Sequence, residues 1–217
     1  MMPPEVSLPG FTRFLEVCRK QGLLLEHDPP RLPALTAEEF TAGLPLDPLL
    51  AAVHTQVGYI GLDEGFTLLR AGDARQSDLL RVNERWRRDR AEPLGSLLVF
   101  GKEEMLVYYY ATIPHLTNKR GQQPVVKIDV HEEPYAVPLA SNVDRFFDTY
   151  SHYLEVLVAQ PEYEELGPAV LTFPWQVPEF IARDKPLVEL LRAGRFDFLM
   201  PKDEETRTWV ARVLGAE

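Results

Sequence analysis

The chain has 217 residues, of which 45% are hydrophobic and 26% charged, a composition typical of a globular protein rather than a disordered or membrane-embedded one. No apolar run approaches the ~20 residues that a membrane helix requires, and residues 1–5 lack the features of a signal peptide, so we expect no membrane association and a cytoplasmic location. The 33 acidic against 23 basic residues give a net charge of −10, which opposes nucleic-acid binding and favours a basic partner, although acidity also serves solubility.

The N-terminal segment predicts one amphipathic helix followed by irregular chain. Apolar residues recur at helical spacing over residues 11–22, and Gly22 ends the pattern. Cys18 is the single cysteine, which excludes an intrachain disulfide, and we expect it to fill a core position on this helix. Residues 23–26 favour a short strand. Residues 27–33 carry three prolines and predict a loop.

Two short helices and a glycine-rich pair of strands come next. The capping-box spacing at residues 36–39 predicts one helix start, and residues 48–54 predict a second helix that ends near Gly58. Residues 58–69 contain three glycines and predict a strand, a tight turn and another strand. Their spacing matches neither a dinucleotide fingerprint nor a phosphate-binding loop.

Residues 77–91 predict a strongly charged helix with an apolar side around Trp86. Its other side carries a row of arginines at positions 81, 85, 87, 88 and 90. This row has two interpretations: a patch for nucleic acid or phosphate, or a solvated face paired with nearby acids such as Glu84, Asp78 and Asp89. Because the rest of the chain is acidic, we favour the paired face.

The central stretch predicts an antiparallel sheet. Apolar, aromatic and β-branched runs predict strands at residues 97–100, 106–113, 124–130 and 135–139. Residues 101–104 are polar and predict a hairpin turn, and Pro138 places the last strand near an edge. The connections are mostly too short to hold helices, so neighbouring strands are expected to run antiparallel.

After Ala140 the apolar period changes to that of a helix, which we expect over about residues 142–157 and packed on one face of the sheet. The predicted fold class is therefore α+β, a mainly antiparallel sheet with helices around it. The remaining residues, 158–217, predict a helical extension, with Asp184 capping one helix and a last helix starting near Asp203. No flexible linker precedes the extension, so we expect one domain over residues 1–217.

The sequence contains none of the usual motifs for metal binding or catalysis. None of the five histidines pairs with another at i, i+4, and no HExxH motif is present, so no metal or cofactor is expected. His131 lies in the best local cluster, where a polar turn is a sufficient explanation. No serine stands in a nucleophile motif. We therefore expect no enzymatic activity; a small enzyme whose site is assembled from dispersed residues is the least favoured alternative.

Adjacent carboxylates in predicted turns, together with one tyrosine, are the candidate protein-binding residues. In a strand, Tyr109 points to the face opposite to Tyr108 and Tyr110, and an exposed tyrosine often anchors an interface. We expect the acidic pairs to project into solvent and to steer a basic partner. The candidate residues are Asp63, Glu64, Glu103, Glu104, Tyr109, Glu132 and Glu133.

The order of these segments resembles the SUKH superfamily. The resemblance rests on Leu-Pro-Leu-Asp-Pro-Leu-Leu from Leu44, Pro-Leu-Gly-Ser-Leu-Leu-Val-Phe-Gly from Pro93, the tyrosine-rich strand, Pro-Val-Val-Lys-Ile-Asp from Pro124, and Leu-Ala-Ser-Asn-Val-Asp-Arg-Phe-Phe from Leu139. It covers about residues 44–157. It implies an α+β binding domain, often an immunity protein that neutralises a bacterial toxin, and we expect that toxin to be a basic nuclease. A regulatory or scaffold protein of the same fold, or a module for an unrelated peptide, are the alternatives.

Overall fold

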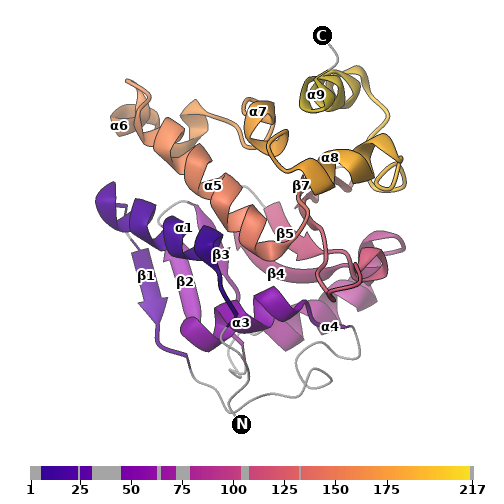
Figure 1. Cartoon of the computed structure of the whole chain (residues 1–217), viewed down its shortest axis with the longest axis horizontal. Helices are drawn as coiled ribbons and strands as arrows, with labels where there is room; N and C mark the ends of the chain where they lie inside the picture. The colour runs from indigo at the N-terminus through magenta and orange to yellow at the C-terminus, as the bar shows by residue number, and fades with distance from the viewer. Residues whose placement is uncertain are drawn as a thin grey trace.

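A computed structural model describes residues 6–23, 25–30, 45–62, 65–71, 79–103, 108–131 and 133–215 of the chain (Figure 1). The strands are β1 (Leu25–Asp28), β2 (Tyr59–Leu62), β3 (Phe66–Leu68), β4 (Leu98–Glu103), β5 (Tyr108–Thr112), β6 (Val125–Asp129) and β7 (Tyr135–Ala140). The α-helices are α1 (Pro9–Lys20), α3 (Pro48–Gln56), α4 (Leu79–Asp89), α5 (Val143–Val158), α6 (Tyr163–Leu166), α7 (Pro178–Ile181), α8 (Lys185–Arg192) and α9 (Glu204–Leu214). Short 3₁₀ helices are η1 (Leu94–Ser96), η2 (Pro114–Leu116) and η3 (Gly167–Val170).

Within the described residues, seven strands form one sheet in the order β1-β2-β3-β4-β5-β6-β7, and every neighbouring pair is antiparallel. Each strand therefore lies beside the strands that precede and follow it in the sequence. This arrangement confirms the predicted α+β class with a mainly antiparallel sheet. It also places Pro138 in an edge strand, where a missing backbone N–H costs least.

Two local predictions are wrong. Residues 101–103 were predicted as part of a hairpin turn, but they belong to β4. Glu103, the last residue of this strand, pairs with Phe66 of β3 and Tyr108 of β5. Residues 27 and 28 are not loop, because they extend β1 and pair with Ile60 and Tyr59 of β2. In both places, pairing with a neighbouring strand satisfies the backbone and overrides local composition. The helix start predicted at residues 36–39 lies outside the described residues.

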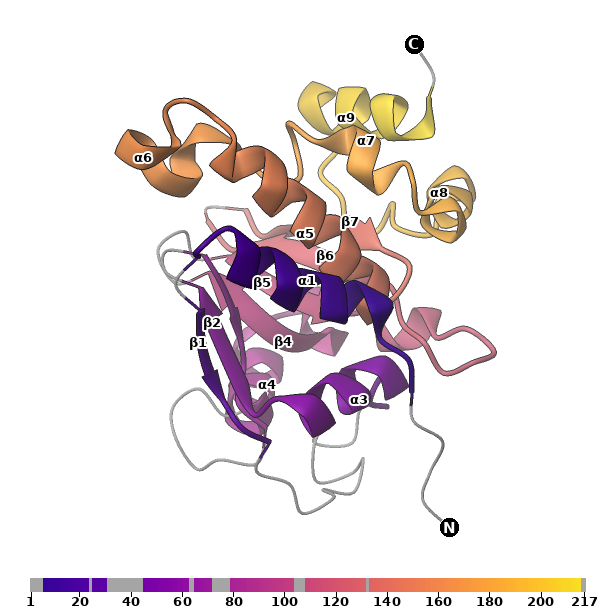
Figure 2. The same cartoon turned by 60° about the vertical axis from the view of Figure 1, so that its left-hand side comes forward.

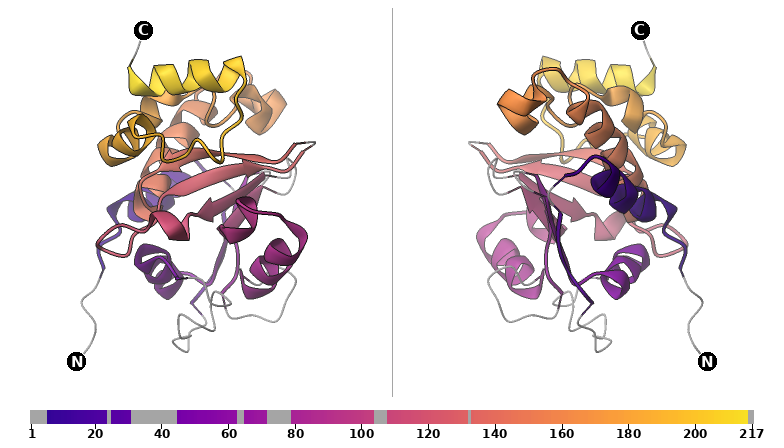
Figure 3. Two further views of the ribbon diagram at one scale, coloured as in Figure 1. Left: turned by 90° about the vertical axis from the view of Figure 1, so that its right-hand side faces the viewer. Right: turned by 90° about the vertical axis from the view of Figure 1, so that its left-hand side faces the viewer.

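Helices cover both faces of the sheet. Figure 2 shows α1 and α5 packed together over the sheet, and Figure 3 shows β1 to β3 running between α3 on one side and α4 on the other. Side-chain contacts agree with this arrangement: Phe146 of α5 packs on Phe66 and Tyr110 of the sheet, whereas Trp86 of α4 packs on Tyr109. Tyr109 and Tyr110 thus point to opposite faces, as the period of a strand requires.

The core on the α5 side is an aromatic cluster around Phe66. The centre of its ring lies 5.5 Å from the ring centre of Phe146 and 5.8 Å from that of Phe147, both in α5, and 5.4 Å from that of Tyr110 in β5. The predicted apolar stripe of the helix faces this cluster, and the Asn142 side chain caps the first turn by accepting from Arg145 N at 3.0 Å. Aromatic pairs at these separations add to the free energy of burying their surface.

The buried carboxylate of Asp47 joins α3 to the segment before β6. It accepts hydrogen bonds from Leu49 N at 2.7 Å and Leu50 N at 3.1 Å, which satisfies the first turn of α3. Its other oxygen accepts from Gln123 N at 2.6 Å. Burial raises the pKa of Asp47, and these three backbone donors oppose that rise by stabilising the carboxylate. One side chain therefore sets both the start of α3 and its position.

The C-terminal extension packs on β7, and its last helix packs back on the part of the same extension that precedes α7. Asp184 caps α8 as predicted and also accepts from Ser141 N at 2.6 Å, next to the end of β7. Leu199 O accepts from Ala136 N at 2.9 Å, which satisfies a backbone donor on the edge strand. Trp209 of α9 donates from Nε1 to Pro174 O at 3.2 Å. The extension therefore covers part of the β7 edge.

Helices α1 and α5 approach so closely that Gly10 has no room for a side chain. A Cβ atom there would lie 2.1 Å from the backbone oxygen of Asp144. The Asp144 side chain in turn accepts from Phe11 N at 3.0 Å, which holds the start of α1 in this position.

Replacing Gly10 with alanine is therefore expected to lower the free energy of unfolding by about 1–3 kcal/mol, because a backbone atom must move to remove the clash. The intrinsic helix preference of alanine, about 1 kcal/mol over glycine, acts in the opposite direction. Urea unfolding measures the effect, with Glu16→Ala on the exposed side of α1 as the control. A Gly10→Ala protein as stable as the parent contradicts the close packing of α1 on α5.

Candidate functional site

A cavity of about 690 Å³ opens beside the C-terminal half of α5, and we call it the α5 cavity. Residues 21–23 after α1 line one side, and residues 163–169 and 171–173, in and after α6, line another. The sheet forms its floor with Glu103, Tyr108 and Lys127. Figure 2 shows α6 beyond the end of α5, on the face of the sheet that carries α1. The volume is within the usual range of about 300–1,000 Å³ for ligand sites.

Strand register brings the charged residues of the floor together. Glu103 lies opposite Tyr108, and Tyr110 lies opposite Lys127, so these side chains share the face under α5. The Tyr110 hydroxyl donates a short hydrogen bond to Glu103 Oε1, and the Tyr150 hydroxyl donates to the same oxygen at 3.4 Å. The buried carboxylate thus has phenol donors from both the sheet and α5.

Lys127 is the second charged group of the floor. Its Nζ donates to Phe173 O at 2.8 Å, lies 3.9 Å from Glu103 Oε2 and sits 3.7 Å from the centre of the Tyr108 ring. Burial lowers the pKa of Lys127, and the charge of Glu103 opposes that change. The ammonium group is thus held by a carbonyl, a carboxylate and an aromatic face.

Three tyrosines that line the cavity, Tyr108, Tyr150 and Tyr153, and Tyr110, which donates to Glu103 beside it, have raised pKa values and are neutral hydrogen-bond donors. Burial raises the pKa of Tyr110 and Tyr150 well above the usual value, and the nearby Glu103 charge raises both further. Burial also raises the pKa of Tyr108 and Tyr153. Phenols that stay protonated donate to carboxylates and present a negative aromatic face. This arrangement suits binding of a polar or cationic group against aromatic walls.

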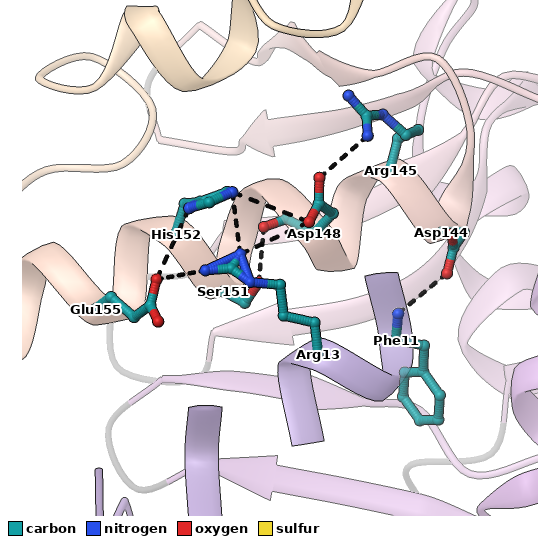
Figure 4. Close-up of polar contacts among 8 residues, drawn as sticks. All are labelled: Phe11, Arg13, Asp144, Arg145, Asp148, Ser151, His152 and Glu155. Carbon is teal, nitrogen blue, oxygen red and sulfur yellow. Dashed lines mark hydrogen bonds and ion pairs between the residues drawn. The ribbon is translucent and has the colours of Figure 1, made fainter. Parts of the chain in front are cut away.

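A second polar cluster lies on the outside of α1 and α5 (Figure 4). Arg13 of α1 lies 3.7 Å from Asp148, 2.5 Å from Glu155 and 3.0 Å from His152 Nε2. Because a guanidinium only donates, His152 Nε2 must accept, which requires the neutral imidazole. Burial and Arg13 both lower the pKa of His152, in agreement with that state. These side chains are partly exposed, and their evident role is to hold α1 on α5.

Of the predicted binding residues, the structure describes Glu103, Tyr109 and Glu133. Asp63, Glu64, Glu104 and Glu132 lie outside the described residues. Glu133 is exposed between β6 and β7, as expected, whereas Tyr109 is half-buried against Trp86 at 5.0 Å between ring centres. The expectation that Glu103 projects into solvent is wrong, because it is the last residue of β4 and its carboxylate is buried beside Tyr110 and Lys127.

The residues that the sequence did not predict as parts of a site are Lys127, Tyr110, Tyr150 and the segment after α6. One local signal was present: a lysine inside the apolar run Val125-Val126-Lys127-Ile128 is unusual, because a buried ammonium needs partners. The identity of those partners depends on strand register and on α5, which local sequence does not give.

Three arginines of the row, Arg85, Arg88 and Arg90, contact one acid and one aromatic ring of α4. Arg85 and Arg88 both contact Asp89, at 3.2 Å and 2.9 Å, and Arg90 lies over the Trp86 ring. These contacts agree with the interpretation of this face as a paired, solvated surface. Asp78 lies outside the described residues.

Among the described residues, no three His, Cys, Asp or Glu side chains are grouped closely enough to hold a metal ion. None of the helices in those ranges combines the length and apolar character needed to cross a membrane. Comparison of the chain with protein-family models, curated proteins and solved structures gave no match.

Proposed function

We propose that this chain is a non-enzymatic protein-binding domain of the SUKH type, and specifically an immunity protein that neutralises a basic toxin domain. The resemblance to SUKH proteins in residues 44–157 supports the family part of the proposal. That segment corresponds to β2 through β7, α3, α4 and α5, which form the sheet and the helices that cover it.

The observation that carries the binding part is the α5 cavity in a strongly acidic chain. The net charge is −10, and the exposed carboxylates of Glu164 and Glu165 line the cavity. Tyrosines are enriched at the energetically important centres of protein interfaces, and Tyr108 and Tyr153 line this cavity. Complementary charge raises the association rate of a basic partner.

The test is binding to the product of the adjacent reading frame, because an immunity protein is usually encoded beside its toxin. Co-expression is expected to abolish the growth defect that this product causes alone. The association rate is expected to fall at least about tenfold between low and high salt, since charge steering is screened over a Debye length of about 8 Å at physiological strength.

The dissociation rate is expected to change less over the same salt range, because steering acts on the encounter. A product that binds with a salt-independent association rate contradicts the charge-steering part of the proposal. If the neighbouring product does not bind, or stays toxic during co-expression, the immunity function is wrong. A regulatory or scaffold role predicts instead a partner encoded elsewhere.

A further inference from the structure

We infer that the α5 cavity binds an arginine side chain presented by a basic protein partner. This inference rests on the proposed function and names the chemistry of its site. It is carried by three features of the cavity: its charge, its aromatic wall and a carboxylate oxygen on its floor.

The charge of the cavity favours a cation. Three carboxylates line it, those of Glu103, Glu164 and Glu165, against one ammonium group, that of Lys127, which leaves a net charge of −2 among the described lining residues. Glu103 and Lys127 lie 3.9 Å apart and largely offset each other, so Glu164 and Glu165 dominate the field at the cavity. An anionic ligand meets repulsion from these exposed carboxylates.

The aromatic wall favours a cation that stacks on rings. Tyr108, Tyr150, Tyr153, Tyr163 and Phe173 all line the cavity. The chain's own Lys127 already places its ammonium 3.7 Å from the centre of the Tyr108 ring, so a cation on a tyrosine face is an arrangement that this cavity accepts.

The floor offers an acceptor for a donating ligand. Glu103 Oε1 receives the hydroxyls of Tyr110 and Tyr150, whereas Oε2, within the described residues, faces only the Lys127 ammonium at 3.9 Å, beyond hydrogen-bond distance. Each carboxylate oxygen accepts up to two hydrogen bonds, so Oε2 has capacity for a further donor.

Arginine meets these conditions better than lysine. A guanidinium is planar and weakly hydrated, and it stacks on aromatic rings while its N–H groups donate to carboxylates. A lysine ammonium is a strongly hydrated point charge and loses more on entering an aromatic cavity. The volume of about 690 Å³ is sufficient for an arginine side chain together with part of the chain that carries it.

The experiment uses the full chain and the peptide acetyl-Gly-Arg-Gly-amide. The control is the same peptide with citrulline, which is uncharged, in place of arginine. Titration followed by ¹H–¹⁵N NMR is expected to show saturable shifts at residues lining the α5 cavity, with a Kd of about 1–10 mM for so small a probe. The citrulline peptide is expected to bind at least about threefold more weakly, because it has the shape of arginine without its charge.

The chain offers a matched pair of variants. Glu164→Gln/Glu165→Gln removes two exposed carboxylates from the first turn of α6 at the cavity, and Glu204→Gln/Glu205→Gln removes two from the first turn of α9 away from it. The first variant is expected to weaken the arginine peptide about threefold or more, and the second to leave it unchanged. Equal effects of the two variants, equal binding of citrulline, or shifts away from the cavity overturn the inference.

Free L-arginine distinguishes a protein partner from a small-molecule ligand. Its α-carboxylate is repelled by Glu164 and Glu165, so it is expected to bind more weakly than the peptide; tighter binding of the free amino acid overturns the assignment to a protein. The two proposals also fail separately. If the neighbouring product binds equally well to the parent and to Glu164→Gln/Glu165→Gln, and the peptide does not bind, the cavity inference is wrong while the proposed function stands. If the peptide binds as expected and the neighbouring product does not bind, the proposed function is wrong while the cavity inference stands.

Discussion

Replacing Phe146 with alanine is expected to lower the free energy of unfolding by about 3–5 kcal/mol, the largest effect among the changes considered. The Phe146 side chain is fully buried. The centre of its ring lies 5.5 Å from that of Phe66 in β3, 5.1 Å from that of Tyr110 in β5 and 5.7 Å from that of Phe100 in β4. Truncation leaves a cavity between α5 and three strands, and rings held by that many elements cannot all move to fill it.

Urea unfolding of the parent and the variant measures this loss, and Phe198→Ala provides the matched control. Phe198 undergoes the same change of side chain, but it is 43% exposed, so its loss is expected to be well below that of Phe146. A Phe146→Ala midpoint equal to that of the parent contradicts the placement of α5 on the sheet. Equal losses at both positions contradict the difference in burial.

Acid is expected to destabilise the protein through His54 by about 3 kcal/mol between neutral pH and pH 4. Burial lowers the pKa of His54 from 6.5 to about 4, so in this window the unfolded chain takes up a proton that the folded protein excludes. Stability therefore falls as the pH decreases through 6.5 and continues to fall until about pH 4. The magnitude follows from about 1.4 kcal/mol for each unit of pKa difference.

Urea unfolding at several pH values between about 7.5 and 4 tests this prediction with His54→Gln, whose side chain does not titrate. The readout is the difference in pH dependence between variant and parent, because acidic residues and the other histidines contribute to both curves. His27→Gln, at an exposed position of β1, is the control. If the curves of parent and His54→Gln stay parallel from neutral pH to pH 4, His54 is not the buried neutral base that the structure places at the end of α3.

The Glu103 carboxylate shows why the site was harder to predict than the fold. In the sequence it stands in the polar run Gly101-Lys102-Glu103-Glu104, and local composition favours a solvated turn. In the structure the same residue ends β4, beside Tyr110 of the next strand and Tyr150 of α5. A buried carboxylate depends on these distant donors, and their approach is a property of the assembled sheet and helix.

Repeating patterns of side chains determined most of the elements from the sequence alone. The alternation in residues 108–110 predicted two opposite faces for the tyrosines, and the helical period after Ala140 predicted α5 with its buried stripe. The start of α8 at its capping residue Asp184 could also be predicted, because a cap acts within one turn of the helix. These features depend on residues close together in the chain, so the sequence by itself contains the required information.

Only the tertiary structure decided what lies between those elements. The α5 cavity joins residues after α1, the floor of β4 to β6, and the segment after α6, and Lys127 meets Phe173 across 46 positions of sequence. Whether a charged side chain is exposed or held by partners depends on strand register, on which face a helix covers and on where the C-terminal extension returns. These features depend on packing between residues far apart in the sequence, so local periodicity does not predict them.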